Sequence, residues 1–222
     1  MAWEIFSIIG TIAFALSGAI VAMEEDYDIF GVYILGMATA FGGGALRNLL
    51  IGYPIGAFWQ QDMLFQIALL SMTIIFLFPN KLITHWKRWE NITDAIGLSA
   101  FAVQGALYAQ KLNLPISATI VASVLTGIGG GVIRDLLARR KPLVLRAEVY
   151  AFWTILAGFL IGAKIVVSDW ALYILFILIV CFRMISIHYK WHLPHRRLDN
   201  KERSLHKQKL HPFTYRKGFF LF

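Results

Sequence analysis

Ala40-Phe41-Gly42-Gly43-Gly44-Ala45-Leu46-Arg47-Asn48-Leu49-Leu50 is a stretch that the chain uses twice. Residues 127–137 read Gly127-Ile128-Gly129-Gly130-Gly131-Val132-Ile133-Arg134-Asp135-Leu136-Leu137. The triplets and the arginines share one offset without a gap, 134 − 47 = 87 residues. A glycine triplet weakens a helix, and a cation is costly inside an apolar segment. Finding both twice in one register predicts a duplicated unit whose centre carries the function.

The composition is that of a membrane protein. The 222 residues are 58% hydrophobic and 15% charged, with a mean hydropathy of +0.64, whereas soluble domains are about 25% charged. The net charge of +8 is local, because ten of the 21 Lys and Arg residues lie between Arg183 and Lys217. Such a tail fits a cytoplasmic segment beside anionic lipid, and it gives no support to a nucleic-acid partner.

Seven apolar runs predict an all-α integral membrane protein with seven transmembrane helices. The runs are 5–23, 29–46, 63–80, 91–110, 112–133, 149–167 and 170–187.

The repeat extends beyond the triplets, since residues 10–19 match residues 97–106 at the same offset. Each copy holds three helices, and this odd number makes the second copy enter the membrane in the opposite sense. We therefore predict an inverted 3+3 repeat plus one extra helix, an arrangement common in transport proteins. The predicted parts are a transmembrane channel domain (1–187) and a basic cytoplasmic tail (188–222). Within the domain, repeat one covers about 3–86, repeat two about 90–167 and helix seven about 169–187.

The loop charges predict the orientation. Arg47, Lys111 and Lys164 lie on the side of the N-terminus, while Lys81, Lys87, Arg88, Arg139, Arg140, Lys141 and Arg146 lie on the other side with the tail. The positive-inside rule then places the N-terminus outside and the C-terminus in the cytoplasm of a bacterial or archaeal plasma (inner) membrane.

The triplets have two interpretations. If Gly42, Gly43, Gly44 and Gly129, Gly130, Gly131 break or kink their helices, freed carbonyl oxygens can replace the hydration shell of a monovalent cation. Thr39, Ser123 and Thr126 can add hydroxyl oxygens to such a pore. Alternatively, small residues spaced by four, such as Gly36, Ala40 and Gly44, let two helices pack closely.

The arginines also have two interpretations. Arg47 and Arg134 can snorkel to the interface, or they can pair across helices and form a gate. The candidate partners are Asp135, beside Arg134, and Asp94 and Gln104 of the fourth helix.

Several chemistries are not supported. No Lys-Ser/Thr pair follows the glycines, so a nucleotide loop is excluded. The single cysteine, Cys181, allows no internal disulfide and no thiolate metal site, and we expect it to be buried. We predict no enzyme activity, no cofactor and no metal beyond permeating potassium.

These residues resemble the prokaryotic branch of the trimeric intracellular cation (TRIC) channel family. The resemblance covers roughly residues 5–187 and rests on 10–19, on the two triplets with Arg47 and Arg134-Asp135, and on 142–146. It implies a homotrimer with one pore per subunit, conducting monovalent cations and chiefly potassium, beside kinked second and fifth helices. Members often carry Asp where this chain has Ser7 and Asn48, so the pore is expected to be less acidic on that side.

Three functions are compatible with these features. A passive potassium channel is the leading hypothesis, and a secondary carrier of glycine or another small zwitterion is the alternative, since many bacterial relatives bear a glycine-transporter label. A structural membrane protein leaves the duplicated glycines unexplained. For the tail, adsorption to anionic lipid and disorder both remain open.

Overall fold

The chain folds as an all-helical bundle in the computed structural model, which describes residues 2–78, 86–146 and 149–191. Its helices are α1 (Ala2–Glu24), α2 (Ile29–Ile51), α3 (Asp62–Leu77), α4 (Trp86–Lys111), α5 (Ile116–Leu137), α6 (Leu143–Arg146), α7 (Tyr150–Gly162) and α8 (Asp169–His188), with a short 3₁₀ helix η1 (Ile55–Phe58). The described residues contain no strand. The expectations for the tail beyond residue 191 and for the loop 79–85 lie outside the described residues.

Seven long helices match the seven apolar runs, and this confirms the predicted fold class. Five of them are long and apolar enough to cross a membrane, whereas α3 and α7 are shorter, with 16 and 13 residues. The second helix is longer than predicted. It runs past Leu46 to Ile51 and ends at Gly52, whose left-handed φ of 70° suits glycine.

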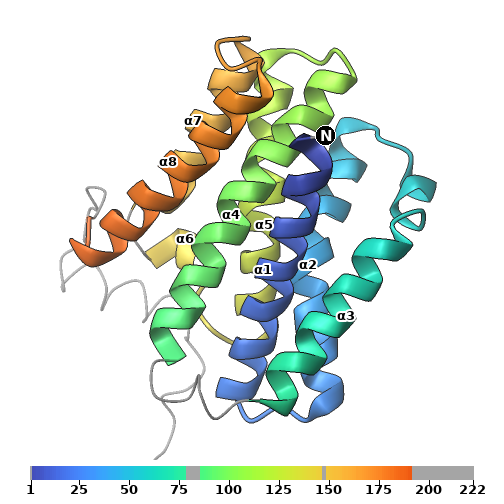
Figure 1. Cartoon of the computed structure of the whole chain (residues 1–222), viewed down its shortest axis with the longest axis vertical. Coiled ribbons are helices and arrows are strands. Elements are labelled where there is room, and N and C mark those ends of the chain that lie inside the picture. The colour runs from blue at the N-terminus through green and yellow to red at the C-terminus, as the bar shows by residue number, and fades with distance from the viewer. Residues whose placement is uncertain (1, 79–85, 147–148, 192–222) are drawn as a thin grey trace, which may run out of the picture. The chain divides into compact units, whose positions relative to one another are not determined.

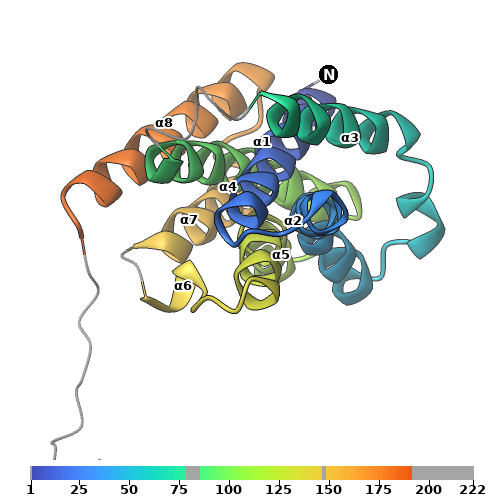
Figure 2. The same cartoon turned by 90° about the horizontal axis from the view of Figure 1, so that it is seen from below.

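Helices α1, α2, α4 and α5 form the centre of the bundle, as Figure 1 and the view from below in Figure 2 show. Helix α3 lies on one side of them, and α7 and α8 lie on the other. In Figure 1, α1 runs downward and α4 upward, while α2 runs upward and α5 downward. The first two helices of each copy therefore run in opposite senses, α1 against α4 and α2 against α5.

Contacts between the copies are reciprocal, as an inverted repeat requires. Gly10 leaves room for the ring of Phe101, and Gly97 leaves room for the ring of Phe14. All four positions are related by the 87-residue offset. The two rings meet edge to face, with centroids 5.2 Å apart, where α1 crosses α4.

The glycine triplets form the crossing of α2 and α5. A Cβ on Gly43 would lie 2.8 Å from the carbonyl oxygen of Leu125 and 2.9 Å from the nitrogen of Gly130. A Cβ on Gly130 would collide with the carbonyl oxygen of Thr39. The backbones therefore touch, and only glycine fits.

Both helices continue through their triplets, so the predicted break is absent and frees no carbonyl oxygens there. The triplets do serve the close packing that the small-residue spacing indicated.

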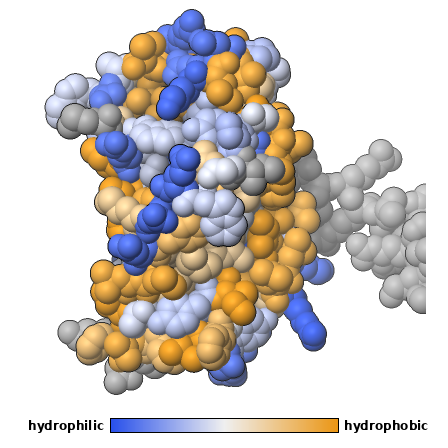
Figure 3. Space-filling model, turned by 90° about the vertical axis from the view of Figure 1, so that its right-hand side faces the viewer, coloured by the Kyte–Doolittle hydropathy of each residue, from blue (hydrophilic) through white to orange (hydrophobic). Residues whose placement is uncertain are grey.

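The outer surface is apolar. Figure 3, which shows the side of the bundle where α3 lies, has broad hydrophobic areas, with hydrophilic residues gathered mainly in its upper half. Large exposed side chains include Phe30, Ile34, Leu70, Ile74, Ile174 and Ile177. Cys181 also lies on the surface, so the expectation that it is buried is wrong.

Replacing Gly43 with Ala should lower the stability of the bundle, because the added methyl group meets backbone atoms that cannot move aside. Overpacking of this kind costs about 1–3 kcal/mol. Gly44→Ala is the matched control, since a Cβ there meets only the Arg47 Nη2 atom, at 3.8 Å. Thermal unfolding of the purified protein in detergent measures both changes. Equal melting temperatures for the two variants would contradict the close crossing.

Candidate functional site: two buried arginines

Arg47 and Arg134 lie on the crossing face of their helices. Each follows the central glycine of its triplet, Gly43 or Gly130, by four residues, and residues four apart share a helix face. The crossing therefore directs both side chains into the bundle, where Arg47 is 2% and Arg134 is 0% exposed. Neither guanidinium reaches the surface of the bundle, so neither side chain snorkels. Because the copies are inverted, the two arginines lie toward opposite ends of the bundle.

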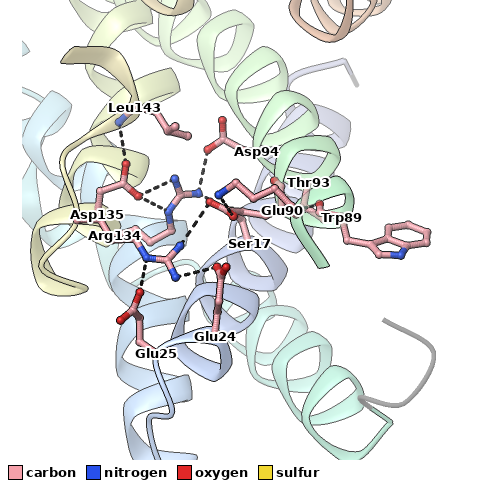
Figure 4. Close-up of polar contacts among 12 residues, drawn as sticks. Ser17, Glu24, Glu25, Trp89, Glu90, Thr93, Asp94, Arg134, Asp135 and Leu143 are labelled. Atoms are coloured by element: carbon pink, nitrogen blue, oxygen red, sulfur yellow. Dashed lines mark hydrogen bonds and ion pairs between the residues drawn. The ribbon is translucent and has the colours of Figure 1, made fainter. Parts of the chain in front are cut away.

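Arg134 has two carboxylate partners (Figure 4). Its Nη1 donates to Asp94 Oδ1 at 2.9 Å, and its Nε donates to Asp135 Oδ1 at 2.9 Å. The Nη2 atom is 2.8 Å from the same Asp135 oxygen. Nη1 also donates to the Ser17 hydroxyl at 2.5 Å. The other Asp135 oxygen accepts from the Leu143 backbone N–H at 2.9 Å. This network joins α1, α4, α5 and the start of α6 and contains more negative than positive charge.

Arg140 forms a second ion-pair network at the same end. Its guanidinium is 2.7 Å from Glu24 and 2.6 Å from Glu25, which lie at the end of α1, and 3.7 Å from Glu90 of α4. Lys87 also pairs with Glu90, at 2.7 Å. Partial burial lowers the pKa of Arg140, but its hydrogen bonds to Glu24 and Glu25 outweigh this and hold the pKa above its ordinary value. Arg140 is therefore charged at all physiological pH values.

Arg47 has neutral partners. Its Nε and Nη2 donate to Asn48 Oδ1 at 3.0 and 2.7 Å, and its Nη1 donates to Gln104 Oε1 at 3.1 Å. Gln104 in turn donates to the Ser7 hydroxyl at 2.9 Å. The guanidinium lies 3.6 Å from the centre of the Tyr108 ring, a cation–π contact. Among the described residues no carboxylate lies within ion-pair distance of Arg47.

Two cavities reach the Arg47 site. The inner cavity, of about 20 Å³, is lined by Gly44, Arg47, Asn48, Gln104 and Thr126 among others. That volume holds about one water molecule. The outer vestibule, of about 440 Å³, is lined by residues that include Glu4, Ser7 and Tyr108. Gln61 and Leu64 line both cavities, which are therefore neighbours.

The other candidate pore residues have mixed positions. The Thr126 hydroxyl donates to the Ala122 carbonyl at 2.7 Å, and the Thr39 hydroxyl donates to the Leu35 carbonyl at 2.6 Å, close to the crossing. Ser123 faces α7 instead, where it donates to the Thr154 carbonyl at 2.7 Å. Of the glycines, Gly42 faces Ile133, Gly129 faces Gly43, and Gly131 faces Tyr150 and Asp94.

Some residues of the two networks were not candidates from sequence. Ser17, Tyr108 and the Arg140 cluster are polar residues that a motif search passes over. The 87-residue offset holds a usable signal, because Ser17 aligns with Gln104 and Ser7 aligns with Asp94. Each arginine bonds the residue that follows it and the Ser17 or Gln104 equivalent in the other copy.

Comparison with known proteins gives consistent matches. A family model described as "Glycine transporter" matches residues 4–80 and 91–164. The UPF0126 membrane protein YvgT of Bacillus subtilis is 63% identical over 202 residues, which are 90% of this chain and 100% of that protein. A solved structure of a TRIC cation channel, described as the structural basis for conductance, is 34% identical to this chain. The TM-score is 0.76, over 90% of this chain and 99% of that one. The TRIC trimeric intracellular cation channel orthologue from Rhodobacter sphaeroides is 28% identical, with a TM-score of 0.77, over 84% and 97% of the two chains.

Asp94→Asn should destabilise the bundle by about 3 kcal/mol, since it removes one partner of a fully buried cation. Asp28→Asn makes the same chemical change at an exposed position. There Asp28 caps α2 by accepting from the Gly31 N–H at 2.8 Å, and Asn caps a helix equally well. Thermal unfolding of both variants is the measurement. If Asp28→Asn lowers the melting temperature as much as Asp94→Asn does, the buried ion pair of Arg134 does not stabilise the bundle more than an exposed carboxylate does.

Salt should weaken the stabilising effect of the Arg140 network more than that of the Arg134 network. Arg140→Gln removes two short ion pairs, to Glu24 and Glu25, whose side chains are about one third exposed, at a cost of about 1 kcal/mol at low ionic strength. The longer pair with the buried Glu90, at 3.7 Å, is lost as well, but Glu90 keeps its pair with Lys87. In 1 M KCl, where the screening length is about 3 Å, most of that cost should vanish. The cost of Asp94→Asn should persist, because its pair is buried. Unfolding at both salt concentrations tests this, and a salt-independent effect of Arg140→Gln would contradict it.

Proposed function

The chain belongs to the family of the TRIC channels, whose sequence model is described as "Glycine transporter", and from this premise we propose that it is a passive channel for monovalent cations, chiefly potassium. It is a membrane protein of the transport class and not an enzyme. The proposal includes one pore in each subunit of a homotrimer, close to the crossing of α2 and α5.

The observation that carries the proposal is the polar interior of an apolar bundle. Arg47 and Arg134 are buried toward the two ends of one helix crossing, within segments long enough to span the membrane. Ionisable groups at such depth are expensive and mark ion or substrate pathways. The vestibule and the inner cavity bring water to within reach of this crossing from the Arg47 side.

Oxygen atoms along this approach suit a weakly held cation. The inner cavity has the amides of Gln61, Asn48 and Gln104 and the hydroxyl of Thr126 in its wall. Such neutral oxygens can replace part of the hydration shell of potassium without trapping the ion. Past the crossing, Asp94 and Asp135 give the other half a negative charge that favours cations.

Opening requires α2 and α5 to separate, because their backbones touch at Gly43 and Gly130. Each glycine lowers helix stability by about 1 kcal/mol relative to alanine, so bending at the triplets is the least costly way to separate them. The triplets then have two roles: they allow tight packing in the closed state and bending in the open state.

The assembly and orientation are part of the proposal. The Rhodobacter sphaeroides orthologue is described as trimeric, and we extend that state to this chain. The excess of Lys and Arg in the loops on the side of Arg139 to Lys141 supports a cytoplasmic location for that side. The N-terminus and the vestibule then face outward, across a prokaryotic plasma membrane.

Planar-bilayer recording of the purified protein should give unitary currents in symmetric KCl. Thr126→Val, which removes an oxygen from the inner cavity, should reduce the unitary current about two- to tenfold, since 1.4 kcal/mol of barrier is a factor of ten. Thr119→Val is the control on the same helix, because that hydroxyl donates only to the Pro115 carbonyl, at 3.2 Å. Absent currents together with saturable glycine uptake into proteoliposomes would replace the channel with the alternative carrier.

A further inference from the structure

The two arginine sites occupy equivalent positions but differ in charge. Arg134 has Asp135 beside it and Asp94 across from it. At the equivalent positions around Arg47 the chain has Asn48 and Ser7, which are neutral. Arg134 therefore has two carboxylate partners. Arg47 has none among the residues that the structure describes.

An uncompensated guanidinium at 2% exposure is expensive, because burial removes the water that stabilised its charge. The ring of Tyr108 and the amide oxygens of Asn48 and Gln104 supply dipoles but no opposite charge. These contacts use three of the five N–H donors of Arg47. Arg47 also lines the inner cavity of about 20 Å³.

We propose that a small monovalent anion, a halide ion, binds in the inner cavity against the guanidinium of Arg47. The anion supplies the negative charge that a carboxylate supplies to Arg134 in the other copy. It enters through the vestibule, whose wall includes the exposed acid Glu4, and its size is limited by a cavity with room for about one water molecule. The amide of Gln61, shared by both cavities, adds an N–H donor.

Binding of this anion changes what a cation meets on its way to the crossing. Without the anion, a potassium ion that enters from the vestibule approaches the buried positive charge of Arg47. With the anion, the Arg47 site is neutral and the repulsion is removed. This consequence rests on the proposed channel function, whereas the anion site itself does not.

Anomalous diffraction from crystals grown in bromide tests the site directly. We expect a bromide peak within hydrogen-bond distance of Arg47 in the natural protein. Asn48→Asp supplies the carboxylate that Asp135 supplies in the other copy, and it should remove the peak while Arg47 stays in place. Ser168→Asp adds the same charge at an exposed helix cap and should keep the peak. No peak in the natural protein, or a peak that persists in Asn48→Asp, would overturn the proposal.

Thermal unfolding gives a second readout that needs no crystal. Chloride and bromide, compared with acetate and gluconate at equal ionic strength, should raise the melting temperature of the natural protein and of Ser168→Asp. They should leave Asn48→Asp unchanged, and Ser7→Asp serves as the second variant if Asn48→Asp does not fold. A rise with the halides but not with acetate supports a halide site in the inner cavity, whereas an equal rise with acetate would contradict a site of that size. Equal melting temperatures in all four anions would contradict the site.

The currents separate this inference from the channel proposal. Replacing chloride with gluconate should reduce the potassium current of the natural protein about tenfold and leave that of Asn48→Asp unchanged. Potassium currents that ignore the anion in both proteins would overturn the inference and keep the channel. No potassium current in either protein under any anion would overturn the channel proposal, while the bromide experiment would still decide the site.

Discussion

The backbone contact between Gly43 of α2 and Gly130 of α5 determines where the polar groups of this bundle lie. Only glycine allows the two helices to approach so closely, and each arginine lies one turn beyond the contact on the same face. The crossing therefore holds two guanidinium groups inside an apolar bundle, away from its surface. The surrounding polar side chains stabilise these buried cations. Asp94 and Ser17 accept from Arg134, and Gln104, which donates to Ser7, accepts from Arg47.

The duplicated sites have diverged in electrostatics and kept their geometry. Arg134 donates to Asp135 and Ser17, and Arg47 donates to the equivalent Asn48 and Gln104. The Arg134 end is also joined by the Arg140 network, which links the end of α1 to α4. The Arg47 end instead opens to a vestibule. A bundle with ion-pair networks at one end and a vestibule at the other fits a pathway that admits ions from the vestibule and opens by movement at the triplets.

Much of this architecture was accessible from the sequence, because apolar runs and an exact offset report directly on helices and on inverted symmetry. The offset also pairs Ser7 with Asp94, which is the origin of the charge difference between the sites. Whether the glycine triplets break their helices could not be predicted from the sequence. Three glycines favour a break in isolation, but the packing of α2 on α5 keeps both helices continuous. The length of α2 was underestimated for a similar reason, since the buried partners of Arg47 allow the helix to continue past a charge.

Solvent accessibility at the inner cavity tests the central claim, that ions approach the α2–α5 crossing through the Arg47 side. Gly44 lines that cavity and has room for a side chain, and Cys181 on α8 can be replaced by Ser to give a cysteine-free background. In this background Gly44→Cys should lose its potassium current when a small cationic thiol reagent is applied from the vestibule side, whereas the background alone should keep its current. An unmodified current in Gly44→Cys, with the cysteine shown to be reduced and reactive after unfolding, would contradict the account.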